Sequence, residues 1–174
     1  MLVPMRAILD AADKNGYAQG AFNVNAVCQV KAAVDVHQIL RSPAIIQGAD
    51  LANGFMGGRT DFANSTLEDK KAGAKNIGAA VKKYAADSDI PVALHLDHGK
   101  NFDSCIAAIE GGYTSVMIDG SSLPFDENVE LTREVVKYAH ERGVTVEGEL
   151  GVLAGVEDHV FAATSTYTLP LRAI

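Results

Sequence analysis

An acid and an imidazole stand side by side at the end of an apolar segment, residues 91–99. The segment begins at Pro91 and ends in Asp97, His98 and Gly99. Short apolar runs bounded by proline and glycine are typical of buried strands. A neutral imidazole is the commonest metal ligand, and an adjacent carboxylate can move protons on a metal-bound substrate. His98 could equally cap a helix or complete a hydrogen bond in the core, so these residues alone leave both roles open.

Further carboxylates end two later apolar segments. Asp119 follows residues 114–118, and Glu147 and Glu149 lie two residues apart, on the same side of a predicted strand. Carboxylates at such positions need a cation, hydrogen-bond donors or water, because an unpartnered buried charge costs several kcal/mol. Oxygen ligands often complete a metal site, so these acids favour one, and a solvated strand end is the alternative.

The acidic pair Glu157 and Asp158 lies in a predicted loop that contains Gly151 and Gly155. Such a loop could act as a lid that brings an acid to the site, and an ordinary acidic surface loop is the alternative. The remaining histidines are interpreted as structural or surface residues, and His95 has no obvious partner in the sequence. The set is His37, His95, His140 and His159.

Strands alternate with helices along the chain, which predicts a parallel sheet with right-handed crossovers. A helix at 4–15 opens the chain, and residues 49–65 read as a loop around at most one short helix. The other predicted helices are 26–41, 66–86, 103–110 and 126–142; the predicted strands are 20–25, 44–48, 91–99, 114–120 and 144–150; residues 151–168 read as a loop.

Two arrangements fit this pattern: an open doubly wound sheet and part of a (β/α)8 barrel. Each predicted strand ends in polar residues, and a barrel brings all its strand ends to one site, whereas an open sheet uses mainly those beside its switch point. No GxGxxG or P-loop motif follows a strand. We therefore predict an α/β fold of the TIM (β/α)8-barrel class with about five of its eight βα units present, since complete barrels typically need ~250 residues.

Composition narrows the class of protein. The 174 residues suit one domain, and a net charge of −7 without a basic patch argues against nucleic-acid binding. No apolar stretch approaches the ~20 residues of a membrane span, and the amino terminus lacks a signal-peptide layout. Cys28 and Cys105 fall in predicted helices without CxxC spacing, as expected for core thiols in a reduced cytoplasm.

The ordered motifs from residue 4 to residue 168 resemble the class II, metal-dependent ketose-bisphosphate aldolases. They are Gly20–Asn23, Ile45–Gln47, Ala93–Gly99, Ser115–Asp119, Leu123–Val129, Val146–Gly151 and the pair Glu157–Asp158. The resemblance implies a (β/α)8 barrel that reversibly cleaves fructose 1,6-bisphosphate to dihydroxyacetone phosphate and glyceraldehyde 3-phosphate, a step of glycolysis and gluconeogenesis. Tagatose bisphosphate is the alternative substrate. The domain would be residues 1–168, followed by a divergent tail at 169–174.

The resemblance also implies roles for individual residues and a Zn²⁺ cofactor. His98 matches a zinc ligand, and Asp97 matches the acid/base that handles the C4 hydroxyl proton. Glu157 matches a loop glutamate that exchanges a proton on the dihydroxyacetone phosphate carbon. Asp119 and Glu149 match carboxylates that line the metal channel. Asn23 matches a substrate-contacting amide, and Gln47 at the end of the next strand is assigned to substrate binding with it.

The chain departs from the family in ways that lead to further expectations. Family members continue for three further βα units, which carry two more zinc-ligand histidines and the phosphate-binding loops. Leu169 stands where the family usually has Asn, and Ala49 where many members have Ser. We therefore expect the 174-residue chain alone to be nearly inactive, and its exposed edge strands to favour a homo-oligomer. The alternatives are a non-catalytic half-barrel that assembles with another chain, and a metal-binding or sugar-phosphate-sensing domain.

Overall fold

A parallel sheet of five strands forms the centre of the protein in the computed structural model, which describes residues 1–152, 155–157 and 160–162, with side chains as far as residue 152. The strands are adjacent in chain order. They are β1 (Ala21–Asn23), β2 (Ala44–Ala49), β3 (Val92–Gly99), β4 (Ser115–Ile118) and β5 (Thr145–Gly148). This order confirms the predicted α/β fold with a partial barrel, because each strand pairs in parallel with the next.

Helices connect the strands, and their ends follow local sequence signals. The helices are α1 (Met5–Asn15), α2 (Val27–Leu40), α3 (Asp50–Met56), the 3₁₀ turn η1 (Phe62–Asn64), α4 (Leu67–Ala86), α5 (Phe102–Glu110) and α6 (Phe125–His140). α4 begins at a capping box, in which Thr66 Oγ1 accepts from the Asp69 backbone N–H at 3.2 Å and the Asp69 carboxylate accepts from the Thr66 N–H at 2.9 Å. α1 ends at Gly16, which adopts a left-handed φ of 67°.

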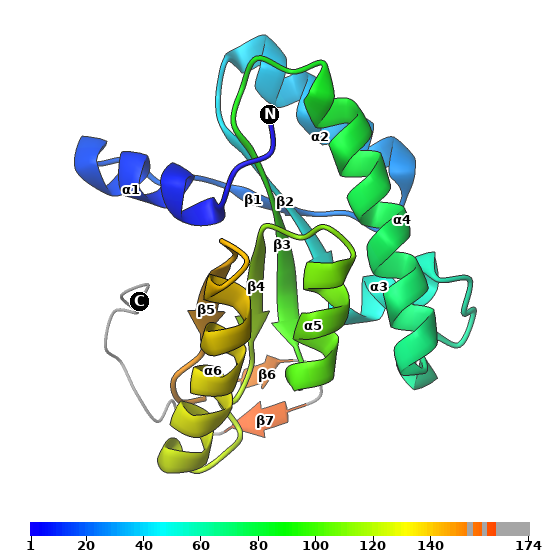
Figure 1. Cartoon of the computed structure of the whole chain (residues 1–174), viewed down its shortest axis with the longest axis vertical. Helices are drawn as coiled ribbons and strands as arrows, with labels where there is room; N and C mark the ends of the chain where they lie inside the picture. The colour runs from blue at the N-terminus through cyan, green and yellow to red at the C-terminus, as the bar shows by residue number, and fades with distance from the viewer. Residues whose placement is uncertain (153–154, 158–159, 163–174) are drawn as a thin grey trace.

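The two faces of the sheet pack against different helices. The outer face carries Ile46, Leu94 and Val116, which join apolar residues of α2, α4, α5 and α6 in one core cluster. On the opposite, inner face, Ile45 and Ala93 pack with residues of α1 in a smaller cluster. Figure 1 shows α1 standing apart from the other helices. Alternate residues of each strand therefore reach either the helix layer or the inner face.

Residues 49–65 differ from the predicted loop with at most one short helix, because they form both α3 and η1. Two of the glycines here, Gly54 and Gly57, allow close packing. A Cβ at Gly54 would lie 1.8 Å from Ser65 Oγ, and one at Gly57 would lie 2.0 Å from the Asp69 carbonyl oxygen. Gly73 of α4 is equally tight, since its Cβ would lie 1.7 Å from the Asn53 carbonyl oxygen. α3 and α4 therefore pack backbone to backbone.

The predicted loop at 151–168 also needs correction, because it contains an antiparallel pair, β6 (Gly155–Glu157) and β7 (Val160–Ala162). In Figure 1 this pair lies at the end of the molecule to which the arrowheads of β3 and β4 point. The predicted tail, residues 169–174, lies outside the described residues. The prediction of two core thiols is right for Cys105, which is buried, and wrong for Cys28, which is exposed.

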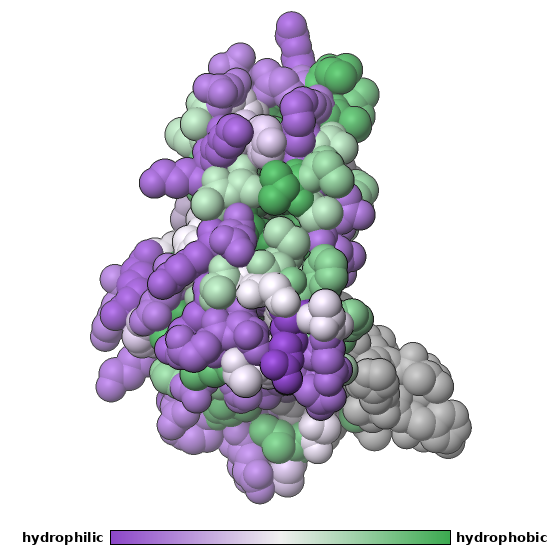
Figure 2. All heavy atoms as spheres, turned by 90° about the vertical axis from the view of Figure 1, so that its right-hand side faces the viewer, coloured by the Kyte–Doolittle hydropathy of each residue, from purple (hydrophilic) through white to green (hydrophobic). Residues whose placement is uncertain are grey.

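The molecular surface mixes charged and apolar side chains. Val36, Ile39 and Leu40 are exposed near the end of α2. Figure 2 shows hydrophobic side chains gathered at the top of the molecule, the end at which Figure 1 shows α2 finishing. None of the helices in the described part of the chain combines the length and apolar character that a bilayer crossing requires.

Candidate metal centre and catalytic site

An irregularity at the carboxyl end of β3 places the acid and the imidazole together. Leu96 pairs with Val116 and Gly99 pairs with Ile118, so three steps along β3 match two along β4. His98 takes a left-handed φ of 49° at this bulge. In a regular strand, Asp97 and His98 would point to opposite faces. Here His98 Nε2 lies 3.9 Å from Asp97 Oδ1, so both side chains reach the same site.

His98, Asp119 and Glu149 form a group that could hold a metal ion. His98 Nδ1 lies 3.1 Å from Asp119 Oδ2 and 3.7 Å from Glu149 Oε2. One potential ligand atom from each residue lies within 4.8 Å of the others, and all three side chains are partly buried. One imidazole and two carboxylates form a donor set that suits divalent cations. The structure thus brings together three residues that the sequence placed on three different strands.

Asp119 is held as a charged carboxylate. The hydrogen bond from His98 lowers the pKa of Asp119 well below its usual range, and hydrogen bonds from Ser121 act in the same direction. Asp119 Oδ1 accepts from the Ser121 backbone N–H at 3.1 Å and from Ser121 Oγ at 2.6 Å, which leaves Oδ2 directed toward His98. A carboxylate fixed and ionised in this way needs no proton release before it contacts a cation.

Asp97 is oriented by a side-chain amide on β1, two strands away in the sheet. Asn23 Nδ2 donates to Asp97 Oδ2 at 2.9 Å, which links β1 to β3 across the end of β2. Gln47 lies between them, opposite Asn23 on one side and opposite His95 on the other. The candidate acid/base, Asp97, and the two candidate substrate amides, Asn23 and Gln47, therefore lie at the carboxyl ends of adjacent strands. Glu157 lies in β6, and its side chain is outside the described part of the structure.

The sequence interpretation missed a polar cluster on the inner face. His95 is 2% exposed; its Nδ1 lies 2.8 Å from Ser115 Oγ and its Nε2 lies 3.3 Å from Glu147 Oε2. The hydrogen bond from His95 lowers the pKa of Glu147. A signal was present, because His95 stands two residues before Asp97 and Glu147 two before Glu149. Because side chains two residues apart on a strand point to the same face, His95 and Glu147 can be predicted to share the face of Asp97 and Glu149.

Gly99 and Cys105 pack closely beneath the bulge of β3. A Cβ at Gly99 would lie 2.6 Å from the Met117 carbonyl oxygen and 2.9 Å from Cys105 Sγ, so only glycine fits there. Burial, with a smaller contribution from Asp50, raises the pKa of the Cys105 thiol to about 12. Cys105 therefore acts as an uncharged apolar residue that packs beneath the bulge.

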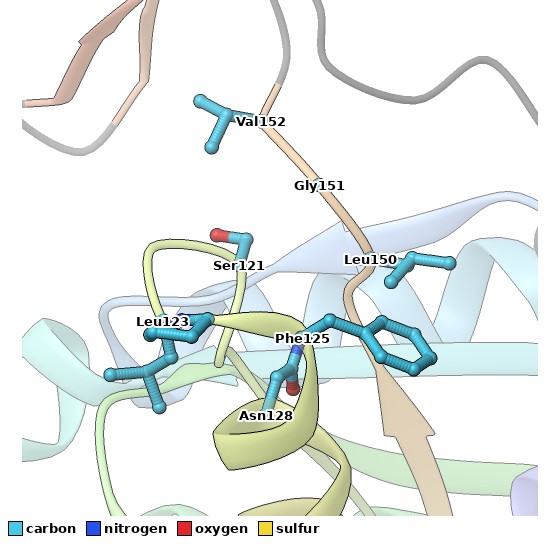
Figure 3. A pocket seen from close by; sticks show the side chains of 8 residues that line it. Ser121, Leu123, Phe125, Asn128, Leu150, Gly151 and Val152 are labelled. Carbon is cyan, nitrogen blue, oxygen red and sulfur yellow. The ribbon is translucent and has the colours of Figure 1, made fainter.

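A pocket of about 370 Å³ adjoins the metal-binding group. Figure 3 shows its lining, in which Phe125 of α6 and Leu150 lie near each other below Gly151 and Val152. Asn128 Nδ2 donates to the Glu149 carbonyl oxygen at 2.7 Å and so ties the end of β5 to α6. The pocket continues the site through Ser121, which binds Asp119, and through Leu150, which follows Glu149.

Comparisons with known proteins identify relatives of this chain in sequence and in fold. Two curated relatives, both named fructose-bisphosphate aldolase, are 46% identical over 173 residues (Treponema pallidum) and 41% identical over 171 residues (Geobacillus stearothermophilus). The alignments cover 97% of this chain but 48% and 54% of the relatives, so the chain spans about half their length. The crystal structure of the YdjI aldolase from Escherichia coli K12 matches with a TM-score of 0.71 at 30% identity, covering 87% of this chain and 51% of that one. The sequence model of class-II fructose-bisphosphate aldolase matches residues 3–174, and the chain belongs to that family.

Proposed function

We propose that this chain carries the chemistry of a class II aldolase: reversible, metal-dependent cleavage of fructose 1,6-bisphosphate to dihydroxyacetone phosphate and glyceraldehyde 3-phosphate. The observation that carries the proposal is the meeting of Asp97, His98, Asp119 and Glu149 at the carboxyl ends of three adjacent strands. Family membership and the names of the relatives support it. Tagatose bisphosphate, which differs at one stereocentre, is the alternative substrate.

The donor set fits the metal that the family implies. His98, Asp119 and Glu149 would hold the ion, and we propose Zn²⁺ because an imidazole nitrogen belongs to the set. A bound divalent ion supplies Lewis-acid polarisation of the substrate ketone. The partly buried position of all three side chains limits competition from water, which strengthens their interaction with a cation.

Asp97 is the proposed acid/base. In cleavage it takes the proton of the substrate C4 hydroxyl, the C3–C4 bond breaks, and the bonding electron pair moves toward the ketone. Asn23 donates to one oxygen of Asp97 and so fixes the orientation of the carboxylate. Glu157 is the proposed group that returns a proton to the dihydroxyacetone phosphate carbon. Asn23 and Gln47 are proposed to contact the substrate.

The test joins this chain, through residue 168, to the carboxyl-terminal half of the Treponema pallidum relative and measures cleavage of both bisphosphates. We expect zinc-dependent cleavage that a chelator removes, and a fall in kcat of about 10²–10⁴-fold in Asp97→Asn. The 174-residue chain alone should show at most a small fraction of this activity. A folded, zinc-loaded chimera that cleaves neither substrate would reject the proposal.

We further propose a cytoplasmic protein that associates with copies of itself. Among the described strands of the parallel sheet, β1 and β5 each pair on one side only. Unpaired strand edges favour association with another chain. Light scattering on the 174-residue chain tests this, and a monodisperse monomer with cooperative unfolding would contradict it.

A further inference from the structure

The polar cluster on the inner face joins three adjacent strands just below the candidate metal centre. His95 of β3 reaches Ser115 of β4 with Nδ1 and Glu147 of β5 with Nε2, at 2.8 Å and 3.3 Å. Ser115 is fully buried and His95 nearly so, whereas the Glu147 side chain is 40% exposed. The bridge therefore runs from the interior of the sheet outward to a carboxylate at the site.

The partners of His95 settle its hydrogen-bonding roles. An ionised carboxylate only accepts, so the Nε2 atom that faces Glu147 carries the ring proton. Nδ1 then accepts from the Ser115 hydroxyl, which can rotate to donate. Both ring nitrogens then have a hydrogen-bonding partner, as buried polar groups normally do. The ring can therefore hold Glu147 in one orientation.

Glu147 lies near the end of β5, and Glu149 follows that strand two residues later. Period-two alternation places two side chains at this spacing on the same side of a strand. The hydrogen bond from His95 is the main cause that lowers the pKa of Glu147, and attraction to His98 acts in the same direction. A negative charge beside the metal-binding group attracts a divalent cation even without direct contact, because screening is weak in a partly buried site.

We propose that His95 is a positioning residue of the metal centre: it holds Glu147 at the inner wall of the site, where the carboxylate strengthens binding of a divalent cation by His98, Asp119 and Glu149. The inference deepens the proposed function and rests on it. Glu147 acts on the cation through its charge. His95 affects cation affinity only indirectly, because it orients Glu147 without contacting the cation.

Calorimetric titration of Zn²⁺ into the 174-residue chain tests the inference. We expect Glu147→Gln and His95→Leu each to weaken binding by about tenfold, and the double variant to bind no more weakly than either single variant, because both act through one carboxylate. His95→Gln keeps an N–H donor toward Glu147 and should bind within about threefold of the wild type. His37→Leu is the matched control, since His37 is also buried but bonds only the Ala33 carbonyl oxygen of its own helix, at 2.7 Å.

The outcomes separate this inference from the proposed function. Wild-type binding of Zn²⁺ with unchanged affinity in Glu147→Gln and His95→Leu would reject the positioning role alone. A wild-type chain that binds no Zn²⁺ would reject the metal centre and the inference with it. If His95→Leu does not fold, Glu147→Gln and ¹⁵N spectra of the wild-type His95 ring decide. A proton on Nδ1 in place of Nε2, or an unchanged affinity in Glu147→Gln, would overturn the inference.

Discussion

The two ends of the inner face of the sheet are built from opposite kinds of residue. At the amino end, Ile45 and Ala93 pack with Met5 and Ile8 of α1 in a cluster that water hardly reaches. At the carboxyl end, partly buried acids surround His98. The same strands thus carry apolar packing at one end and charged groups at the other, with the His95 bridge between them. Stability and chemistry are separated along the strands, as they are in complete (β/α)8 barrels.

The largest expected effect is the loss of cation binding in His98→Ala. The substitution removes the only nitrogen ligand of the group, so Zn²⁺ affinity in calorimetry should fall by more than about 100-fold. The midpoint of urea unfolding should fall only slightly, because His98 belongs to neither apolar core cluster and loses mainly its contact with Asp119. A large loss of stability would show that the carboxyl end supports the fold as well as the chemistry.

Ile8→Ala tests the opposite end. Ile8 is 2% exposed in the cluster with Ile45 and Ala93, so the free energy of unfolding in urea should fall by about 2–4 kcal/mol. Zn²⁺ affinity of the folded variant should stay at the wild-type value. A parallel loss of affinity would mean that the two ends are mechanically coupled.

Ser121→Ala should have a smaller effect, confined to the carboxyl end. It removes the 2.6 Å hydrogen bond that Ser121 Oγ donates to Asp119 but leaves the backbone donor in place. We expect Zn²⁺ affinity to fall by about tenfold, since outer hydrogen bonds orient metal ligands. Ser121→Thr, which retains the hydroxyl, is the control and should bind close to the wild type.

The smallest effect concerns an acid that lies at neither end. The hydrogen bond from the Thr66 backbone lowers the pKa of Asp69 at the start of α4. A carboxylate with a lowered folded pKa contributes stability above its unfolded pKa of ~3.9 and loses that contribution as the pH falls through the folded value. Asp69→Asn should therefore flatten the fall in stability below pH ~4, measured by urea unfolding, and leave Zn²⁺ affinity unchanged. A changed affinity would place α4 within the site.

The strands and the rim of polar residues could be predicted because both are local signals. The apolar run to Leu96 and the polar residues at Asp97 and His98 lie within one short stretch of sequence. The partners of His95 could not be predicted this way, since they depend on the register of three strands. The bulge at His98 is invisible for the same reason, because it exists only relative to β4. The sequence predicts a loop around Gly54, which lies in α3, because a sequence does not show how closely two helices approach.

The alkylation rates of the two cysteines, Cys28 and Cys105, can report how often the site opens. Cys28 is exposed and open to an alkylating reagent, whereas Cys105 is buried, and burial raises its pKa to about 12. Only the thiolate reacts, so Cys105 can be alkylated only after α5 has moved away from β3. Cys105 lies beneath Gly99, the residue after His98. The labelling rate of Cys105 therefore reports how often the bulge of β3 opens locally. A bound cation should lengthen the labelling time of Cys105 and leave that of Cys28 unchanged.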